Sequence, residues 1–257
     1  TKDVEELAND DDIKAVVLRV NSGGGSAYAS EQMWNAVKEL KKKKPVVVSM
    51  GGMAASGGYY MSCGANYIFA EPTTITGSIG IFGMIPDMSG LITDKLGVKF
   101  DEVKTNKYSA FGSPARPFNA EESALLQTNV NRGYDLFLKR VAQGRKMTTA
   151  QVDERAQGRV WIGKDAIKQK LVDAMGSTDD AVKKAAELAK IKDYNVESYP
   201  ANPSWIDNIL ETAQGGNYLD EQLKATLGDY YQPFMMMKSL NKQNAIQARM
   251  TYDIIIR

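Results

Sequence analysis

Over the first 110 residues, short apolar runs alternate with stretches of helical period. The runs Ile13–Val20, Val46–Met50 and Tyr67–Ala70 are short and rich in β-branched or aromatic residues, which predicts buried strands. Between the first two runs, apolar residues recur at helical spacing, at Met33, Trp34, Val37 and Leu40. Strands that alternate with helices are typical of βαβ units, so the pattern predicts an α/β fold with a mostly parallel sheet.

The next segments continue this alternation less regularly. Thr76–Gly83 reads as a β segment interrupted by glycines, and a helix is expected near Leu91–Leu96, ending at Gly97. A further strand is expected at Val98–Val103.

Beyond Pro117 the pattern is helical. Asn119, with Glu122 three residues later, is typical of a capping box at a helix start. Shorter helices are expected near residues 149–157, 164–169 and 178–190. After Pro200 the composition changes, and we expect a catalytic domain over residues 1–195 and a helical extension over 196–257. The extension would serve packing or oligomer contacts, with a membrane-surface role as the alternative.

Two glycine-rich turns follow buried strands and open helices, at Asn21–Ser26 and Gly51–Gly58. In a parallel sheet such turns lie side by side at the carboxyl edge, where open α/β sheets bind ligands. The second turn places Ser56 at a helix start, where free N–H groups favour a developing oxyanion. Ser56 is therefore the candidate nucleophile, and flanking glycines and alanines leave room for a peptide. The alternatives are plain strand-to-helix turns or a phosphate cradle, although neither turn has Walker or dinucleotide spacing.

Composition narrows the chemistry. The chain has 257 residues and no histidine, which excludes a Ser-His-Asp triad and a His-based zinc site. The formal net charge of +1 offers no basic field for nucleic acid. The single cysteine, Cys63, allows no internal disulfide, suggests no metal site, and reads as a core residue rather than a second nucleophile. No metal or cofactor is expected.

Four segments in order resemble the motifs of the signal peptide peptidase A family, the S49 serine peptidases. They are Arg19–Ser26, Ser49–Tyr60, Thr76–Gly80 and Gly158–Trp161, and the similarity covers about residues 10 to 190. The resemblance implies a fold similar to the Clp protease and crotonase superfamily, with repeated ββα units, and a Ser/Lys dyad. It implies Ser56 as nucleophile, Gly24 and Gly57 as oxyanion donors, and Ser78 as the serine that orients the lysine. Gly23 stands where the family commonly has proline.

The resemblance leaves two sources for the lysine. In single-domain members it follows the serine motif, and the matching position here holds Tyr108, with Lys107 next to it. Lys107 is thus a possible base, although an exposed lysine is too basic to act as one. In long members an amino-terminal half supplies the lysine and a carboxyl-terminal half the serine. This chain fits the second half, and alone we expect it to be soluble and nearly inactive.

The resemblance also implies substrates and surroundings. Members degrade cleaved signal peptides and form bowl-shaped, tetramer-like homo-oligomers. An amino-terminal segment holds them at the bacterial cytoplasmic membrane, and their active sites lie on the extracytoplasmic, periplasmic side.

Two other functions remain open. One is a crotonase-like acyl-CoA enzyme, which also uses paired oxyanion turns; the other is a scaffold or peptide-binding half that lacks its base.

Overall fold

The computed structural model describes residues 2–85, 87–113 and 116–200, and beyond them residues 224, 226–228, 231, 235 and 246–249. The chain divides into two units, one formed by residues 1–192 with 245–257 and the other by residues 193–244. The site lies in the first unit. The helical extension predicted over 196–257 falls largely outside the described residues.

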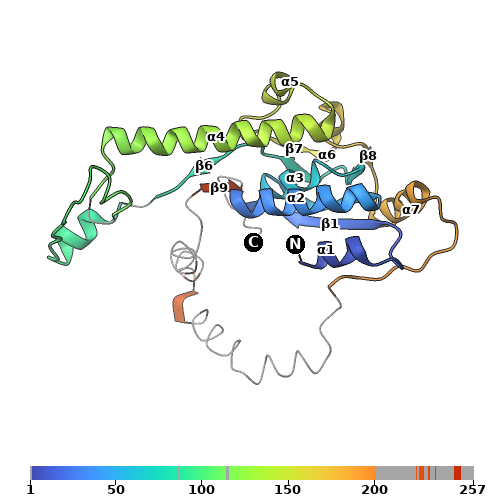
Figure 1. The fold of residues 1–257 in the computed structure, drawn as a ribbon, viewed down its shortest axis with the longest axis horizontal. Coiled ribbons are helices and arrows are strands. Elements are labelled where there is room, and N and C mark those ends of the chain that lie inside the picture. Colours follow the sequence, from blue (N-terminus) through green and yellow to red (C-terminus); the bar gives the residue numbers. More distant parts are fainter. Residues whose placement is uncertain are drawn as a thin grey trace. The chain divides into compact units, whose positions relative to one another are not determined.

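A six-stranded sheet is the centre of the first unit (Figure 1). Its strands are β1 (Val16–Ser22), β3 (Val46–Ala55), β4 (Tyr67–Ala70), β5 (Ile75–Gly77), β7 (Val160–Ile162) and β8 (Ala174–Met175). The long strand β3 pairs in parallel with β1, with β4 through its first half, and with β5 through its last three residues. Only β7 is antiparallel among the described pairings of this sheet. The predicted α/β class with a mostly parallel sheet is confirmed.

Helices cover both faces of this sheet because side chains along β3 alternate between two cores. Val46, Val48 and Met50 join the larger core with residues of α2 (Ala27–Lys43), α3 (Gly57–Ser62) and α4 (Ala120–Arg145). Val47 joins a smaller core against α7 (Thr178–Ala189). The remaining helices are α1 (Lys2–Asn9), α5 (Thr149–Asp153) and α6 (Gly163–Lys168).

The start of α4 follows the sequence prediction. Asn119 accepts a hydrogen bond from the backbone N–H of Glu122, and the Glu122 carboxylate accepts one from the N–H of Asn119. These reciprocal bonds satisfy two backbone N–H groups, so the predicted capping box is confirmed.

The segment between β6 (Phe82–Gly83) and α4 leaves the sheet (Figure 1). It contains the short π-helix η1 (Gly90–Lys95), close to the predicted helix. The strand predicted at Val98–Val103 is wrong, because these residues are not paired with any described strand. Val98, Phe100 and Val103 are exposed, so the apolar alternation here does not face a core.

A second, small sheet consists of β2 (Gly24–Ser26), β9 (Ile246–Arg249) and β6, in the order β2-β9-β6. The strand β9 belongs to the range predicted as a helical extension, so that prediction is wrong for these four residues. Its antiparallel ladders with β2 and β6 satisfy its backbone in place of helical hydrogen bonds. Within the described parts of the chain, no helix combines the length and apolarity that crossing a bilayer requires.

Candidate active site

The two glycine-rich turns meet at the carboxyl ends of β1 and β3. Ser22 pairs with Ala54, and a Cβ placed on Gly58 would lie only 2.7 Å from the carbonyl oxygen of Ser22. Asn21 links the turns directly, because its side-chain oxygen accepts a hydrogen bond of 3.1 Å from the backbone N–H of Met53. The expected juxtaposition of the turns is therefore present, and Gly58 is required for it.

Ser56 lies between the end of β3 and the start of α3. Its backbone has φ 52° and ψ −114°, a conformation that costs free energy for a residue with a side chain. Its N–H donates to the carbonyl of Gly77 at 2.8 Å, which holds the turn against β5. The side chain is fully buried, and its Oγ has no hydrogen-bond partner among the described residues. Buried hydroxyls normally have a hydrogen-bond partner, so an unsatisfied one at a strained turn points to a functional site.

Gly24 and Gly57, the predicted oxyanion donors, lie on the two facing turns. Gly24 has φ 99°, which glycine adopts without strain, and its N–H donates to the hydroxyl of Ser22 at 3.1 Å. An oxyanion that accepted a hydrogen bond from the N–H of Gly24 would have to replace the Ser22 hydroxyl as its acceptor. Gly57 is buried and is the first residue of α3.

Ser78 occupies on β5 the position that Ser56 occupies on β3. Ala55 and Gly77 pair across the two strands, and each serine follows directly with a positive φ, 47° for Ser78. The N–H of Ser78 donates to the carbonyl of Arg159 at 2.7 Å, and a Cβ on Gly77 would lie 2.7 Å from Trp161. The fourth sequence motif, Gly158–Trp161, therefore supports the backbone at Ser78.

Two tyrosines that sequence reasoning left without a role anchor α3 behind Ser56. The hydroxyl of Tyr59 donates to the carbonyl of Leu171 at 2.9 Å, and that of Tyr60 donates to Glu31 at 2.7 Å. Both side chains are buried. All six residues of α3 are buried, so no alternation of exposed and buried positions marks the two tyrosines in the sequence.

Lys107 does not have the surroundings of a general base. Its side chain is 65% exposed and its ammonium donates to Glu121 at 2.7 Å. This hydrogen bond raises the pKa of Lys107, whereas a base needs a lowered one. Tyr108, which stands at the family's lysine position, also donates to Glu121, at 3.3 Å.

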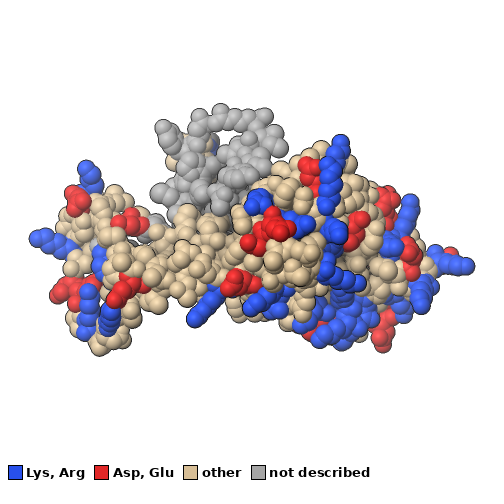
Figure 2. All heavy atoms as spheres, turned by 90° about the horizontal axis from the view of Figure 1, so that it is seen from above, with Lys and Arg blue, Asp and Glu red and all other residues tan. Residues whose placement is uncertain are grey.

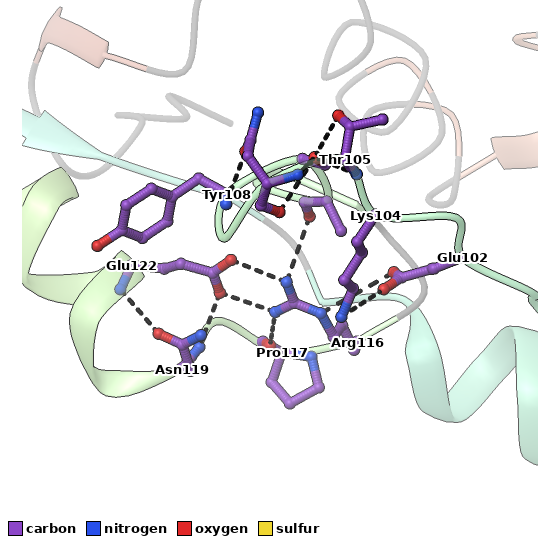
Figure 3. A network of polar contacts seen from close by, with 11 residues as sticks. Glu102, Lys104, Thr105, Tyr108, Arg116, Pro117, Asn119 and Glu122 are labelled. Carbon is purple, nitrogen blue, oxygen red and sulfur yellow. Dashed lines mark hydrogen bonds and ion pairs between the residues drawn. The ribbon is translucent and has the colours of Figure 1, made fainter.

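The segment around Lys107 is fixed by a polar network centred on Arg116 (Figure 3). The Arg116 guanidinium makes two hydrogen bonds to the buried carboxylate of Glu122, at 2.7 and 2.8 Å. These bonds, with the N–H of Asn119, lower the pKa of Glu122 to about 2. Lys104 is engaged here too, paired with Glu102 at 3.1 Å.

Two other reactive groups are also held by hydrogen bonds. Burial lowers the pKa of Lys41, but its ammonium donates to the carbonyls of Gly64 and Ala65, beyond the end of α3 opposite Ser56. Burial raises the pKa of the Cys63 thiol to about 12, so Cys63 has little thiolate character.

Within the described part of the chain, no cluster of three or more His, Cys, Asp or Glu residues is arranged to hold a metal ion.

Charged side chains of both signs are interspersed over the face shown in Figure 2. A partner that bound this face would contact positively and negatively charged side chains close to one another.

A model described as peptidase family S49 matches residues 38–192. Protease 4 of Salmonella typhi is 41% identical over 246 residues, which is 95% of this chain and 38% of that protein. A protein named putative signal peptide peptidase SppA, from Enterococcus faecium, is 35% identical over 232 residues, 88% of this chain and 65% of that protein. This chain thus spans under two fifths of the Salmonella relative.

Among solved structures, a ClpP1 mutant from Listeria monocytogenes aligns over 70% of this chain and 88% of its own. The TM-score is 0.45 at 14% sequence identity.

Proposed function

Because this chain belongs to peptidase family S49, we propose that it carries the nucleophile of a serine endopeptidase, and that the nucleophile is Ser56. The observation that carries this proposal is the buried, unpartnered Oγ of Ser56 on a turn with positive φ. Such strain persists only where the surrounding structure enforces it, and it is concentrated at active sites.

In the proposed reaction, Ser56 Oγ attacks the carbonyl carbon of a peptide bond while a neutral lysine amine takes its proton. The oxyanion accepts hydrogen bonds from the N–H groups of Gly24 and Gly57. The tetrahedral intermediate then collapses, and the lysine ammonium protonates the departing amine. Water, deprotonated by the same lysine, releases the acyl group and restores Ser56. Ser78 would hold the lysine by a hydrogen bond.

The lysine is proposed to come from outside this chain. Lys107 is exposed and paired, and the ammonium of Lys41 is bound by carbonyls at the far end of α3. A base for Ser56 has to be buried or placed near positive charge so that its amine is neutral. The family resemblance implies that the amino-terminal half of a longer polypeptide supplies this lysine. It also implies that the protein is a homo-oligomer.

Cleaved signal peptides are the proposed substrates, at the extracytoplasmic side of a membrane to which another segment anchors the protein. The name of the Enterococcus relative supports this substrate class.

Hydrolysis of a signal-peptide-derived peptide by the full-length protein tests the proposal, with three variants compared. Ser56→Ala should abolish hydrolysis, while Lys107→Met and Lys41→Met should retain wild-type kcat. Activity that survives in Ser56→Ala would make the nucleophile assignment wrong. Activity lost in Lys107→Met, with an unchanged thermal midpoint, would place the base within this chain. Hydrolysis of acyl-CoA but not of peptide would favour the crotonase-like alternative.

A further inference from the structure

The two proposed oxyanion donors lie at the starts of neighbouring helices. Gly57 is the first residue of α3, and Gly24 lies three positions before Ala27, the first residue of α2. Residues of both helices belong to the same core on one face of the sheet, and the two helices contact each other (Figure 1). The separation of the two donor N–H groups therefore depends on how α3 is held against α2.

A hydrogen bond joins the beginnings of these two helices. The hydroxyl of Tyr60, the fourth residue of α3, donates at 2.7 Å to Oε2 of Glu31, the fifth residue of α2. The Tyr60 ring is buried, and its centroid lies 4.3 Å from that of Phe137 on α4. The carboxylate of Glu31 thus holds α3 close to its first residue, Gly57.

Arg140 of α4 fixes the orientation of this carboxylate. Its Nε donates to Oε2 of Glu31 at 3.1 Å, and a terminal nitrogen of the same guanidinium donates to Oε1. The guanidinium carbon lies 4.0 Å from the ring centroid of Trp34, so the ring face supports it. A guanidinium that binds both carboxylate oxygens allows only one orientation, so Glu31 presents Oε2 to Tyr60 in a defined direction.

The end of α3 away from Ser56 has a separate attachment to α2. The ammonium of Lys41, in the last turn of α2, donates to the carbonyls of Gly64 and Ala65 at 2.8 and 3.2 Å. These carbonyls lie beyond the last residue of α3. Of the two attachments, that of Glu31 is the one at the end of α3 that begins beside the nucleophile.

Apolar packing already holds these helices together. Trp34, Tyr60, Phe137 and Val141 all belong to the larger core. An ion pair that loses its hydration often adds little to stability compared with apolar residues of similar volume. The carboxylate of Glu31 adds direction, because a hydrogen bond weakens steeply when its angle changes, whereas an apolar contact is not directional. The network therefore constrains the position of α3 more than it stabilises the fold.

We propose that Glu31 is a positioning residue for the reaction: through Tyr60 it sets the place of the Gly57 N–H relative to that of Gly24. The inference rests on the proposed function, in which these two N–H groups bind the oxyanion. Without the bond between Glu31 and Tyr60, α3 can shift and the hydrogen bonds to the oxyanion weaken. Because the oxyanion exists only after attack, this loss affects the transition state and leaves the binding of the peptide unchanged.

Inhibition of the full-length protein by a peptide aldehyde tests this proposal. Ser56 Oγ adds to the aldehyde carbon and passes its proton to the base, so the aldehyde oxygen takes the place of the oxyanion. The inhibition constant, kcat and KM are compared in Tyr60→Phe, Glu31→Ala, the double variant and Glu31→Gln, which keeps an acceptor for Tyr60. Asp173→Ala is the matched control, because Asp173 also accepts two hydrogen bonds from an arginine of α4 and one from another donor, the N–H of Ile68.

One complete oxyanion donor contributes at least about a hundredfold to kcat, so a displaced donor should cost about tenfold. In Tyr60→Phe and Glu31→Ala we expect kcat to fall by about tenfold and the inhibition constant to rise by the same factor, with KM within about twofold of the wild type. The double variant should lose no more than Glu31→Ala, since both changes remove the same bond. Glu31→Gln and Asp173→Ala should keep the wild-type inhibition constant.

The inhibition constant separates positioning from stability. A purely structural role would reduce the amount of folded protein, and hence kcat, but would leave the inhibition constant unchanged. An unchanged constant in Tyr60→Phe and Glu31→Ala would therefore overturn the proposal, and so would an equal rise in Asp173→Ala. If Glu31→Ala does not fold, Tyr60→Phe decides alone, because it removes a single hydroxyl. A wild-type protein that the aldehyde does not inhibit would instead contradict the proposed function, and this inference with it.

Discussion

The contact between Gly58 and Ser22 gives a sharp test of how the two turns form the site. In Gly58→Ala, the added Cβ would lie 2.7 Å from the Ser22 carbonyl oxygen, whereas ordinary contact begins at 3.4 Å. The obstacle is backbone, which cannot rotate away, so the two turns must separate by roughly 0.7 Å in a close-packed region. Overpacking of this kind costs about 1–3 kcal/mol in the free energy of unfolding.

The same displacement moves Ser56 and Gly57 relative to Gly24. Because a misplacement of about 1 Å in an active site lowers the rate by about a hundredfold, we expect kcat/KM to fall by roughly ten- to a hundredfold. Gly52→Ala is the matched control, since its Cβ would lie 3.9 Å from Asn21, an ordinary contact in the same turn.

Two measurements decide the outcome, urea unfolding of this chain and peptide hydrolysis by the full-length protein. We expect Gly58→Ala to lose both stability and kcat/KM. Gly52→Ala should keep the free energy of unfolding of the wild type and a kcat/KM within twofold of it. Wild-type stability and activity in Gly58→Ala would mean that the turns do not need their close approach, contrary to this prediction. Equal losses in both variants would refute the assignment of the effect to Ser22.

Two further predictions concern the charged groups that support the fold. Hydrogen bonds from Arg116 lower the pKa of Glu122 to about 2, so its contribution to stability is complete above its usual pKa and is lost as the pH falls from about 4.5 to 2. Over that range the thermal midpoint of the wild type should fall more steeply than that of Glu122→Gln; parallel curves would contradict this. Arg145 is nearly buried and makes two hydrogen bonds to Asp173, at 2.9 and 2.7 Å. Arg145→Ala should lower the free energy of unfolding by about 2–3 kcal/mol, and Arg145→Lys by less, in urea titrations; equal values for the two variants would argue against the paired geometry.

Much of the site could be predicted because its signals are local. The strand-turn-helix around Ser56 follows from an apolar run, glycines and a helix start within about fifteen residues. The capping box at Asn119 follows from two residues three positions apart. Each of these elements is determined mainly by its neighbours in sequence.

The elements that sequence reasoning missed depend on distant partners. The strand β9 exists because β2 and β6 accept its backbone, and nothing in residues 246–249 alone distinguishes a strand from a helix. Conversely, apolar and polar residues alternate over Val98–Val103 as they do in a strand, but these residues pair with no described strand. The support of Ser78 by Arg159 likewise joins residues 81 positions apart, and only the resemblance to a family related them in advance.

Labelling by a fluorophosphonate probe reports directly whether Ser56 is an activated nucleophile, because such probes react with a serine made reactive by its base. The probe would be applied to this chain alone and to the full-length protein, each with Ser56→Ala as control. We expect labelling only of the full-length protein, and its loss in Ser56→Ala. Equal labelling of both proteins would contradict it, because the general base would then lie within these 257 residues.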